Sequence, residues 1–275
     1  MSLTERDGRL GVGVIGDAPL GPVIARGLAS AGHAVIGAAV STPDARERVQ
    51  TMIHGAPLLT EAEVVERSEL VVLAFPDDEL EAGIRRLTEA RAWVAGQLVL
   101  HLSPEHGTAI LAGAFDQGVI PLAIHPAIDV TGTSLDLARI AEGWCAVTAP
   151  RPVLPIAQAL VVELGAEPVV IAERDRSVYA EAIRTATTFT RSIVGQATEL
   201  LRGIGIEEPG FVLSSLVRSA ADNALADASA SRLDPRDAAD RPEPGDAAGA
   251  PGASGAPGAD HADPTDAGGV DPAAA

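Results

Sequence analysis

Short apolar runs alternate with amphipathic stretches between residues 10 and 150. The apolar runs predict strands near Leu10–Ile15, Ala34–Val40, Leu70–Phe75, Leu98–Leu102, Ile120–Ile124 and Trp144–Thr148. The stretches between them predict helices near Pro22–Ala31, Ala45–Met52, Glu61–Arg67, Leu80–Ala92 and Ala109–Gln117. This alternation is typical of an α/β fold with a parallel sheet. Because crossovers are right-handed, we expect a doubly wound, Rossmann-like sheet with helices on both faces.

The pattern changes after residue 150. It predicts helices at Pro155–Leu164, Ser177–Leu201 and Pro209–Ala228, with a short strand at Pro168–Ile171. From about residue 229 the chain is rich in Ala, Gly, Pro and Asp and has almost no large apolar side chains, which predicts disorder. The expected organisation is a dinucleotide-binding domain at 8–150, a small helical domain at 151–228 and a disordered acidic tail at 229–275.

The composition restricts the kinds of partner and ligand that we expect the protein to bind. The 275 residues carry a formal net charge of -18, which argues against nucleic acid because a polyanion would be repelled. No apolar run is long enough to span a membrane, and the polar N-terminus does not look like a signal peptide. The single Cys145 excludes an internal disulfide and a cysteine-rich metal site, and no metal-ligand spacing is present. We therefore expect a cytoplasmic protein with a small-molecule substrate, binding neither membrane nor metal.

A glycine turn follows the first predicted strand. The strand–turn–helix expected of a dinucleotide site contains Gly16, Leu20 and Gly21, but its middle glycine is replaced by Ala18. Ala18 adds a methyl where the backbone would approach the pyrophosphate, and Pro19 removes an amide that could bond phosphate. The ancestry of the fold is therefore predicted more firmly than retained cofactor binding.

The end of the second strand predicts a phosphorylated cofactor. An NAD site has an Asp or Glu about 20 residues after the turn, whereas this chain has Ser41 and Thr42, followed by Arg46. These three side chains could bind the ribose phosphate of NADP, with NAD as the alternative cofactor. Arg46 could instead lie on a solvated helix face. After the third strand, Pro76 completes the expected cofactor-binding set, and the acids that follow it could cap a helix.

The fourth and fifth strands end in histidines. His101 and His125 are expected at the carboxyl edge of the sheet, where a cleft forms in this fold, although one of the two could be structural. Ser103 is a further catalytic candidate, but Ser103-Pro104 also reads as the start of a helix. His125 is the predicted proton donor, because histidine can supply a proton near neutral pH.

Four stretches carry a family resemblance: GVGVIGDAPLGPVIARGLASAGH, VLAFPDDEL, HLSPEHG and PLAIHPAIDVTGT. With RSVYAEAIRTATTFTRSIVGQATELL, they resemble an oxidoreductase family of unknown function over residues 8 to 225. Its members join a Rossmann-like domain to a helical C-terminal domain similar to that of 6-phosphogluconate dehydrogenase. The resemblance implies nicotinamide-dependent oxidation or reduction, and the helical domains of this superfamily often form dimers, which makes a homodimer a hypothesis.

The chain departs from this family at several positions. Ala18 replaces a glycine, Pro104 replaces a small residue, and Ala180 stands where a histidine is usual. The chain has no lysine, although lysine assists hydride transfer in better-known dehydrogenases of the superfamily, and the helical domain looks truncated. Two functions therefore remain open: an NADP-preferring oxidoreductase acting on a small carbonyl or imine, and a degenerate, non-catalytic Rossmann protein with a regulatory or interaction role.

Overall fold

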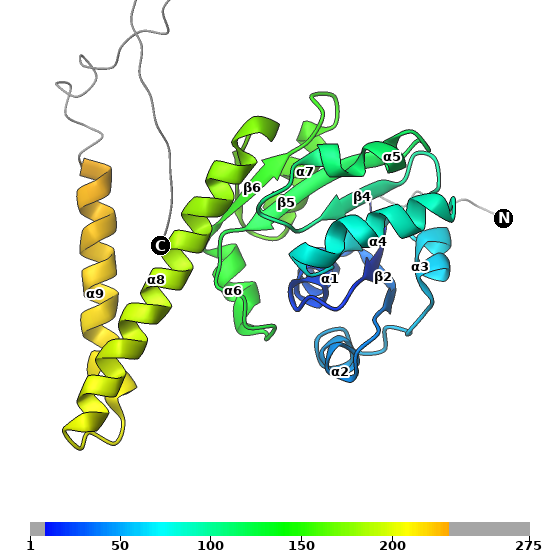
Figure 1. The fold of residues 1–275 in the computed structure, drawn as a ribbon. Coiled ribbons are helices and arrows are strands. Elements are labelled where there is room, and N and C mark those ends of the chain that lie inside the picture. The colour runs from blue at the N-terminus through cyan, green and yellow to red at the C-terminus, as the bar shows by residue number, and fades with distance from the viewer. Residues whose placement is uncertain (1–8, 231–275) are drawn as a thin grey trace, which may run out of the picture. The chain divides into compact units, whose positions relative to one another are not determined.

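A seven-stranded sheet forms the centre of the computed structural model, which describes residues 9–230 (Figure 1). Its spatial order is β2-β1-β3-β4-β5-β6-β7. The strands are β1 (Gly11–Ile15), β2 (Ala34–Ala39), β3 (Leu70–Leu73), β4 (Leu98–His101), β5 (Ile120–Pro126), β6 (Trp144–Thr148) and β7 (Glu167–Val170). The chain leaves β1 toward β2 and returns on the other side to β3, so a topological switch point lies between β1 and β3.

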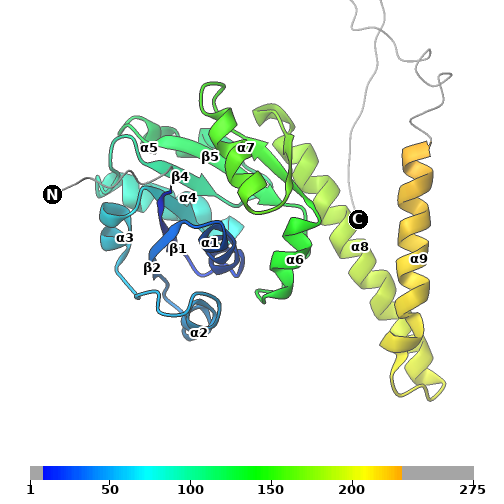
Figure 2. The same cartoon turned by 180° about the vertical axis from the view of Figure 1, so that it is seen from behind.

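Helices cover both faces of the sheet, as the sequence predicts. They are α1 (Leu20–Ser30), α2 (Pro43–Met52), α3 (Glu61–Arg67), α4 (Asp77–Glu89), α5 (Ala112–Phe115), α6 (Leu135–Ala141) and α7 (Leu154–Glu163), with a 3-10 turn, η1, at Thr108–Leu111. One core cluster joins the sheet to α1, α2, α6 and α7, and a second joins it to α3, α4, η1 and α5. Figure 2 shows α1 and α7 in front of the sheet and α4 behind it. Neighbouring β3 residues Val71 and Val72 belong to opposite clusters, as the period of a strand requires.

The last two strands break the expected parallel order. The strands β1 to β5 are parallel, but β6 runs antiparallel to β5, and β7 is parallel to β6. Pro126 at the end of β5 pairs with Cys145 near the start of β6, so the chain returns along the same edge without a full crossover. The short helix α6, which the hydrophobic pattern did not reveal, lies within this return.

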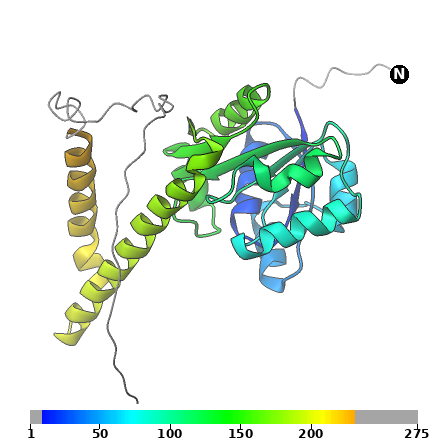
Figure 3. The same ribbon diagram turned by 45° about the horizontal axis from the view of Figure 1, so that its top comes forward.

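The sheet continues past the domain boundary expected at residue 150, because β7 pairs with β6 and α7 contacts both strands. A 3-10 turn, η2 (Glu173–Asp175), then leads into the long helix α8 (Arg176–Gly203), which leaves the edge of the sheet in yellow-green (Figure 3). The chain divides into compact units at 1–209 and 210–275. The described part of the second unit is residues 210–230, which belong to α9 (Pro209–Ala230), and the predicted tail lies almost wholly outside the described residues. No helix in the described part of the chain is long and apolar enough to cross a membrane.

Candidate functional site

The backbone around the glycine turn packs closely on it and binds its N–H groups. Gly16 has a φ of +113°, and a Cβ there would lie 2.4 Å from the carbonyl oxygen of Ala74. Its N–H donates to the Ala39 carbonyl over 3.0 Å, and the N–H of Ala18 donates to the Ala74 carbonyl over 2.8 Å. Two amides of the predicted phosphate loop are therefore bonded to the ends of β2 and β3.

The start of α1 packs tightly on the sheet. A Cβ on Gly21 would lie 2.4 Å from the Ala74 Cβ, so this glycine permits close helix–strand contact. Leu20 is buried at the first position of α1, and Pro19 occupies the N-cap without contributing an N–H. Ala18 packs, partly buried, against the core cluster on that face of the sheet.

Asp17 holds the predicted phosphate ligands. The N–H groups of Ser41 and Thr42 donate to its carboxylate over 2.7 and 3.1 Å, and the Ser41 hydroxyl donates to it as well. Burial opposes ionisation of Asp17, but the bonds from Ser41 and Thr42 outweigh that cost and lower its pKa. An internal anion thus occupies the donors that a ribose phosphate would need.

The arginine nearest this turn is Arg48. Its Nη2 donates to the Asp17 carbonyl over 2.9 Å, and its Nε is buried without a partner among residues 9–230. The predicted ligand Arg46 is exposed. It lies two positions before Arg48 on α2, and two positions along a helix rotate a side chain to a different face. No sequence pattern indicates Arg48, since its contact depends on how α2 packs beside the glycine turn.

A cleft of roughly 520 Å³ opens beside Asp17 and Ser41 at the ends of β1 and β2. Arg86, from α4, lines the cleft and pairs with Glu61. Its guanidinium carbon lies 5.8 Å from the centre of the Phe75 ring. The full lining comprises Gly16, Asp17, Ala39, Val40, Ser41, Leu59, Thr60, Glu61, Phe75, Glu79, Ala82 and Arg86. Its charged side chains are three acids and one arginine, so the cleft is acidic overall.

Pro76 lies next to this cleft as the N-cap of α4. The expectation that Asp77 and Asp78 cap the helix is wrong in detail. Both lie inside its first turn, and the cap position has no side-chain hydrogen bond. Their charges still favour the helix start through its dipole.

His101 organises the loop after β4. It is fully buried, its Nε2 bonds the Gly107 carbonyl at 2.7 Å, and its Nδ1 accepts the N–H of Ser103 over 3.3 Å. Burial first, and then the charges of Arg176 and His106, lower the pKa of His101 to about 3 against the opposing effect of the Gly107 bond. Both ring nitrogens serve the fold, so this histidine matches the structural alternative.

Ser103 closes a turn and starts no helix. Its Oγ accepts the N–H of Glu105 over 3.2 Å, and the next helical turn, η1, begins only at Thr108. The helix start predicted at Ser103-Pro104 is therefore wrong. The carboxylate of Glu173 caps η1 by accepting the N–H groups of Thr108 and Ala109 over 2.8 and 3.1 Å.

His125 has a partner on α8. Its Nδ1 lies 2.9 Å from the hydroxyl of Tyr179, and the two rings meet edge to face. Burial, and then the charge of Arg176, lower the pKa of His125 to about 4, whereas burial raises the pKa of Tyr179 to about 12. At neutral pH the imidazole is therefore uncharged and the phenol holds its proton.

Arg176 underlies this pair. It is 1 % exposed, and its guanidinium donates to the Thr148 hydroxyl and to the carbonyls of Ser103, Ala123 and Ala146. None of these acceptors carries a charge, and burial lowers its pKa to about 10, which still leaves it a cation at neutral pH. Arg176 thus ties β5, β6 and the loop after β4 to the start of α8.

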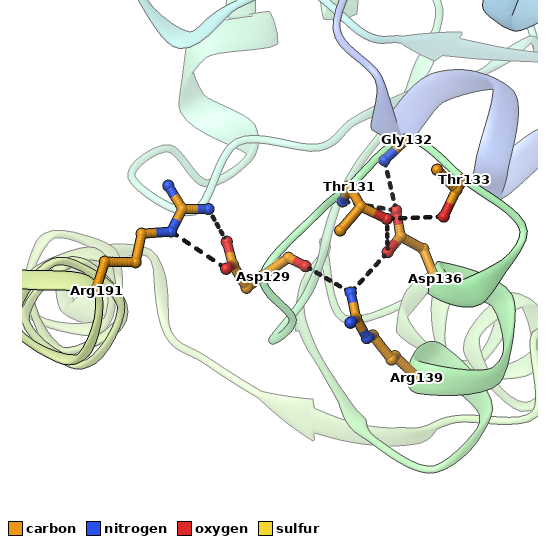
Figure 4. A network of polar contacts seen from close by, with 7 residues as sticks. All are labelled: Asp129, Thr131, Gly132, Thr133, Asp136, Arg139 and Arg191. Carbon is orange, nitrogen blue, oxygen red and sulfur yellow. Dashed lines mark hydrogen bonds and ion pairs between the residues drawn. The ribbon is translucent and has the colours of Figure 1, made fainter. Parts of the chain in front are cut away.

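The loop after β5 is held by Asp136 (Figure 4). Its buried carboxylate accepts the N–H groups of Thr131 and Gly132 over 2.9 and 2.7 Å, and also binds the Thr131 hydroxyl and Arg139. A Cβ on Gly132 would lie 2.9 Å from the Cβ of Pro19, so this loop lies against the start of α1.

The same loop is tied to α8 by an ion pair. Asp129 pairs with Arg191 of that helix (Figure 4). No cluster of three or more histidine, cysteine or acidic residues in the described chain could hold a metal ion. The candidate site lies along the carboxyl edge of the sheet.

Family models match two parts of the chain. Residues 2–126 match a Rossmann-like domain, and residues 143–233 match a domain of unknown function (DUF2520). This confirms the predicted order, in which a Rossmann-like domain precedes a C-terminal domain of unknown function. A search of the curated proteins finds no match.

Solved structures with a similar fold share little sequence identity. A putative NADP oxidoreductase from Bacteroides fragilis aligns with a TM-score of 0.63 at 16 % identity, over 78 % of this chain and 80 % of its own. An imine reductase from Pseudomonas sp. aligns at 0.60 and 16 %, over 85 % and 79 %. An imine reductase variant from Myxococcus stipitatus in complex with NAD+ aligns at 0.55 and 20 %, over 80 % and 74 %.

Proposed function

We propose that this chain is an NAD(P)-dependent oxidoreductase that acts on a small carbonyl or imine. The observation that carries the proposal is the bonded pair of His125 and Tyr179 at the carboxyl end of β5, on the same edge as the glycine turn of β1. Fold alone would not suffice, since this architecture serves many functions. The named oxidoreductases with the same fold support the reaction class.

The spacing along the edge suits a dinucleotide. In this fold the cofactor lies outside the carboxyl ends of the strands, across the switch point. The cleft at β1 and β2 would receive the adenosine half, and β5 lies three strands from β1, or about 14 Å at the usual strand separation. When bound, the cofactor would supply or accept the hydride.

The protein's own task is to move a proton. Tyr179 is the better donor to the reduced substrate, because its phenol is protonated at neutral pH and the side chain is half-buried. His125 can then donate its Nδ1 proton to the phenolate while Nε2 accepts one from water. This assignment keeps His125 in the catalytic set and adds Tyr179, whereas the contacts of His101 and Ser103 give those two residues positioning roles.

The residues at the glycine turn fit a cofactor only in part. A cleft is present, and the unpartnered Nε of Arg48 could donate to a phosphate beside the turn. The predicted preference for NADP rested on Ser41, Thr42 and Arg46, and their contacts do not support it. The proposal is therefore confined to a nicotinamide dinucleotide of either form.

The test is a titration of the purified chain with NADH and with NADPH, followed by nicotinamide fluorescence. A panel of small ketones and cyclic imines should then be assayed for turnover. Binding of at least one cofactor together with turnover of a panel member is the expected result. Failure of both cofactors to bind would overturn the proposal.

A non-catalytic role is the second candidate. It is favoured by the internal hydrogen bonds of the glycine turn. The Asp17 carboxylate accepts the N–H groups of Ser41 and Thr42, and the N–H of Ala18 donates to a carbonyl at the end of β3. In that case the carboxyl edge of the sheet would have no catalytic function, and the chain would have a regulatory or interaction role through its surface. The same titration discriminates the two candidates.

A homodimer belongs to the proposal as well. Along α8, large apolar side chains such as Val178, Phe189 and Ile193 are more than 60 % exposed. Burying such a face against a second copy would remove apolar area from water. Sedimentation velocity of the purified chain should show a dimer, and a monomer at all concentrations would exclude it.

A further inference from the structure

Asp17 lies where this fold discriminates between the two cofactors. In dinucleotide sites a carboxylate near the end of the second strand bonds the ribose hydroxyls of NAD, whereas NADP requires cations or hydroxyls for its 2′-phosphate. By sequence position Asp17 belongs to the glycine turn, 24 residues before Ser41. The fold nevertheless brings its carboxylate to the end of β2, where it bonds both Ser41 and Thr42.

The contacts of the carboxylate leave little room for a phosphate. Three donors from Ser41 and Thr42 bind its two oxygens. A carboxylate can accept about four hydrogen bonds, so one more donor, such as a ribose hydroxyl, can still bind it. A phosphate would have to displace the carboxylate or lie beside it as a second anion.

The neighbouring charges add to this bias. Glu61 and Glu79 line the same cleft, and the one arginine there, Arg86, is paired with Glu61. Arg48 binds the backbone carbonyl of Asp17, which orients the turn without neutralising its carboxylate by direct contact. Resting on the proposed function, we infer that Asp17 selects NAD(H) over NADP(H) by filling the 2′-phosphate position with the protein's own anion.

The experiment compares the dissociation constants of NADH and NADPH for the full chain and three variants. Asp17→Asn and Asp17→Ser both remove the charge, and the second also shortens the side chain. Asp44→Asn is the matched control: it removes a charge from the first turn of α2, and Asp44 has no bond to Ser41 or Thr42 in the described chain. Circular dichroism establishes that each variant is folded.

The parent should bind NADH at least about tenfold more tightly than NADPH. Either substitution of Asp17 should shift that ratio toward NADPH by about tenfold, while Asp44→Asn should change it by less than about threefold. A parent that prefers NADPH, an unchanged ratio in folded Asp17 variants, or an equal shift in Asp44→Asn would overturn the inference alone. If neither cofactor binds to any of the proteins, the proposed function fails and the inference fails with it.

Discussion

Two regions of the same sheet edge contrast with each other. The glycine-loop region, residues 16–21 with Ser41 and Thr42, has the residue types of a cofactor site, yet its polar groups bond one another. In the histidine region, His125 with Tyr179 and Arg176, the sequence predicts only His125 as a catalytic residue, yet tertiary contacts assemble a polar pair there. Strand-end residues thus indicate where a site lies, whereas their partners decide what each residue can do.

The two regions also differ in charge. In the glycine-loop region an anion, Asp17, is surrounded by N–H and O–H donors, which lower its pKa. In the histidine region a buried cation, Arg176, is surrounded by neutral acceptors and helps to keep His125 uncharged. The first arrangement resists phosphate, and the second favours proton transfer between neutral groups.

The largest expected effect comes from Tyr179→Phe. Loss of the phenol should lower turnover by about 10² to 10⁴-fold, the usual contribution of a positioned acid, and should leave cofactor affinity nearly unchanged. Steady-state kinetics with the best substrate, together with cofactor titration, measure both quantities. The variant keeps the ring and so disturbs packing little.

Thr187→Val is the control on the same helix, because the one bond of the Thr187 hydroxyl among residues 9–230 is to the local Ile183 carbonyl. It should turn over like the parent, whereas His125→Asn should lose activity as Tyr179→Phe does. Full activity in Tyr179→Phe would remove the proton donor from the proposal and leave the histidine region with a structural role.

Arg176→Met should have the next largest effect. It leaves the Thr148 hydroxyl and three carbonyls without their buried donor, which should lower the free energy of unfolding by about 3 kcal/mol or more. Urea denaturation measures this change. Arg176→Lys, which keeps a charge but lacks the planar fork, should lie between the parent and Arg176→Met.

Arg176→Met also tests the electrostatic coupling between Arg176 and His125. Arg176 lowers the pKa of His125, so its removal should raise that pKa, as followed by NMR of the imidazole. A stability within about 1 kcal/mol of the parent would show that the four bonds matter little. An unmoved His125 pKa in a folded variant would show that burial alone sets it.

The sequence predicted the fold well and the site less well, for a physical reason. Strand and helix periodicity depends on nearby residues, so every strand from β1 to β7 lies close to its predicted position. The contacts of Asp17 with Ser41, and of His125 with Tyr179, join residues 24 and 54 positions apart. Local patterns do not encode such pairs, and burial then shifts their pKa values further.

The loop after β5, which lies outside both regions, offers a test that varies the pH. Burial opposes ionisation of Asp136, but bonds from Thr131 and Gly132 outweigh it and lower the pKa. A lowered pKa contributes stability above the ordinary value of 3.8, and this contribution is lost as pH falls through the value in the folded state. Asp136→Asn should therefore cost about 2 kcal/mol at pH 7, and the difference from the parent should shrink in acid.

Thermal unfolding across pH measures this effect. Asp129→Asn is the matched control, since its ion pair with Arg191 is exposed and should contribute less than about 1 kcal/mol. A pH-independent difference between the parent and Asp136→Asn would mean that the charge of the carboxylate is not what holds the loop.

The smallest expected effect, Ala18→Gly, returns to the glycine-loop region. Restoring the usual glycine would strengthen nucleotide binding if the Ala18 methyl obstructed the pyrophosphate. The methyl instead packs against the core, so affinity should change by less than about twofold and stability should fall by about 0.5 to 1 kcal/mol. Pro19→Ala, which adds an N–H at the N-cap of α1, is the companion variant. A fivefold tighter complex in Ala18→Gly would show that the methyl faces the cofactor and that the two regions are more alike than their contacts suggest.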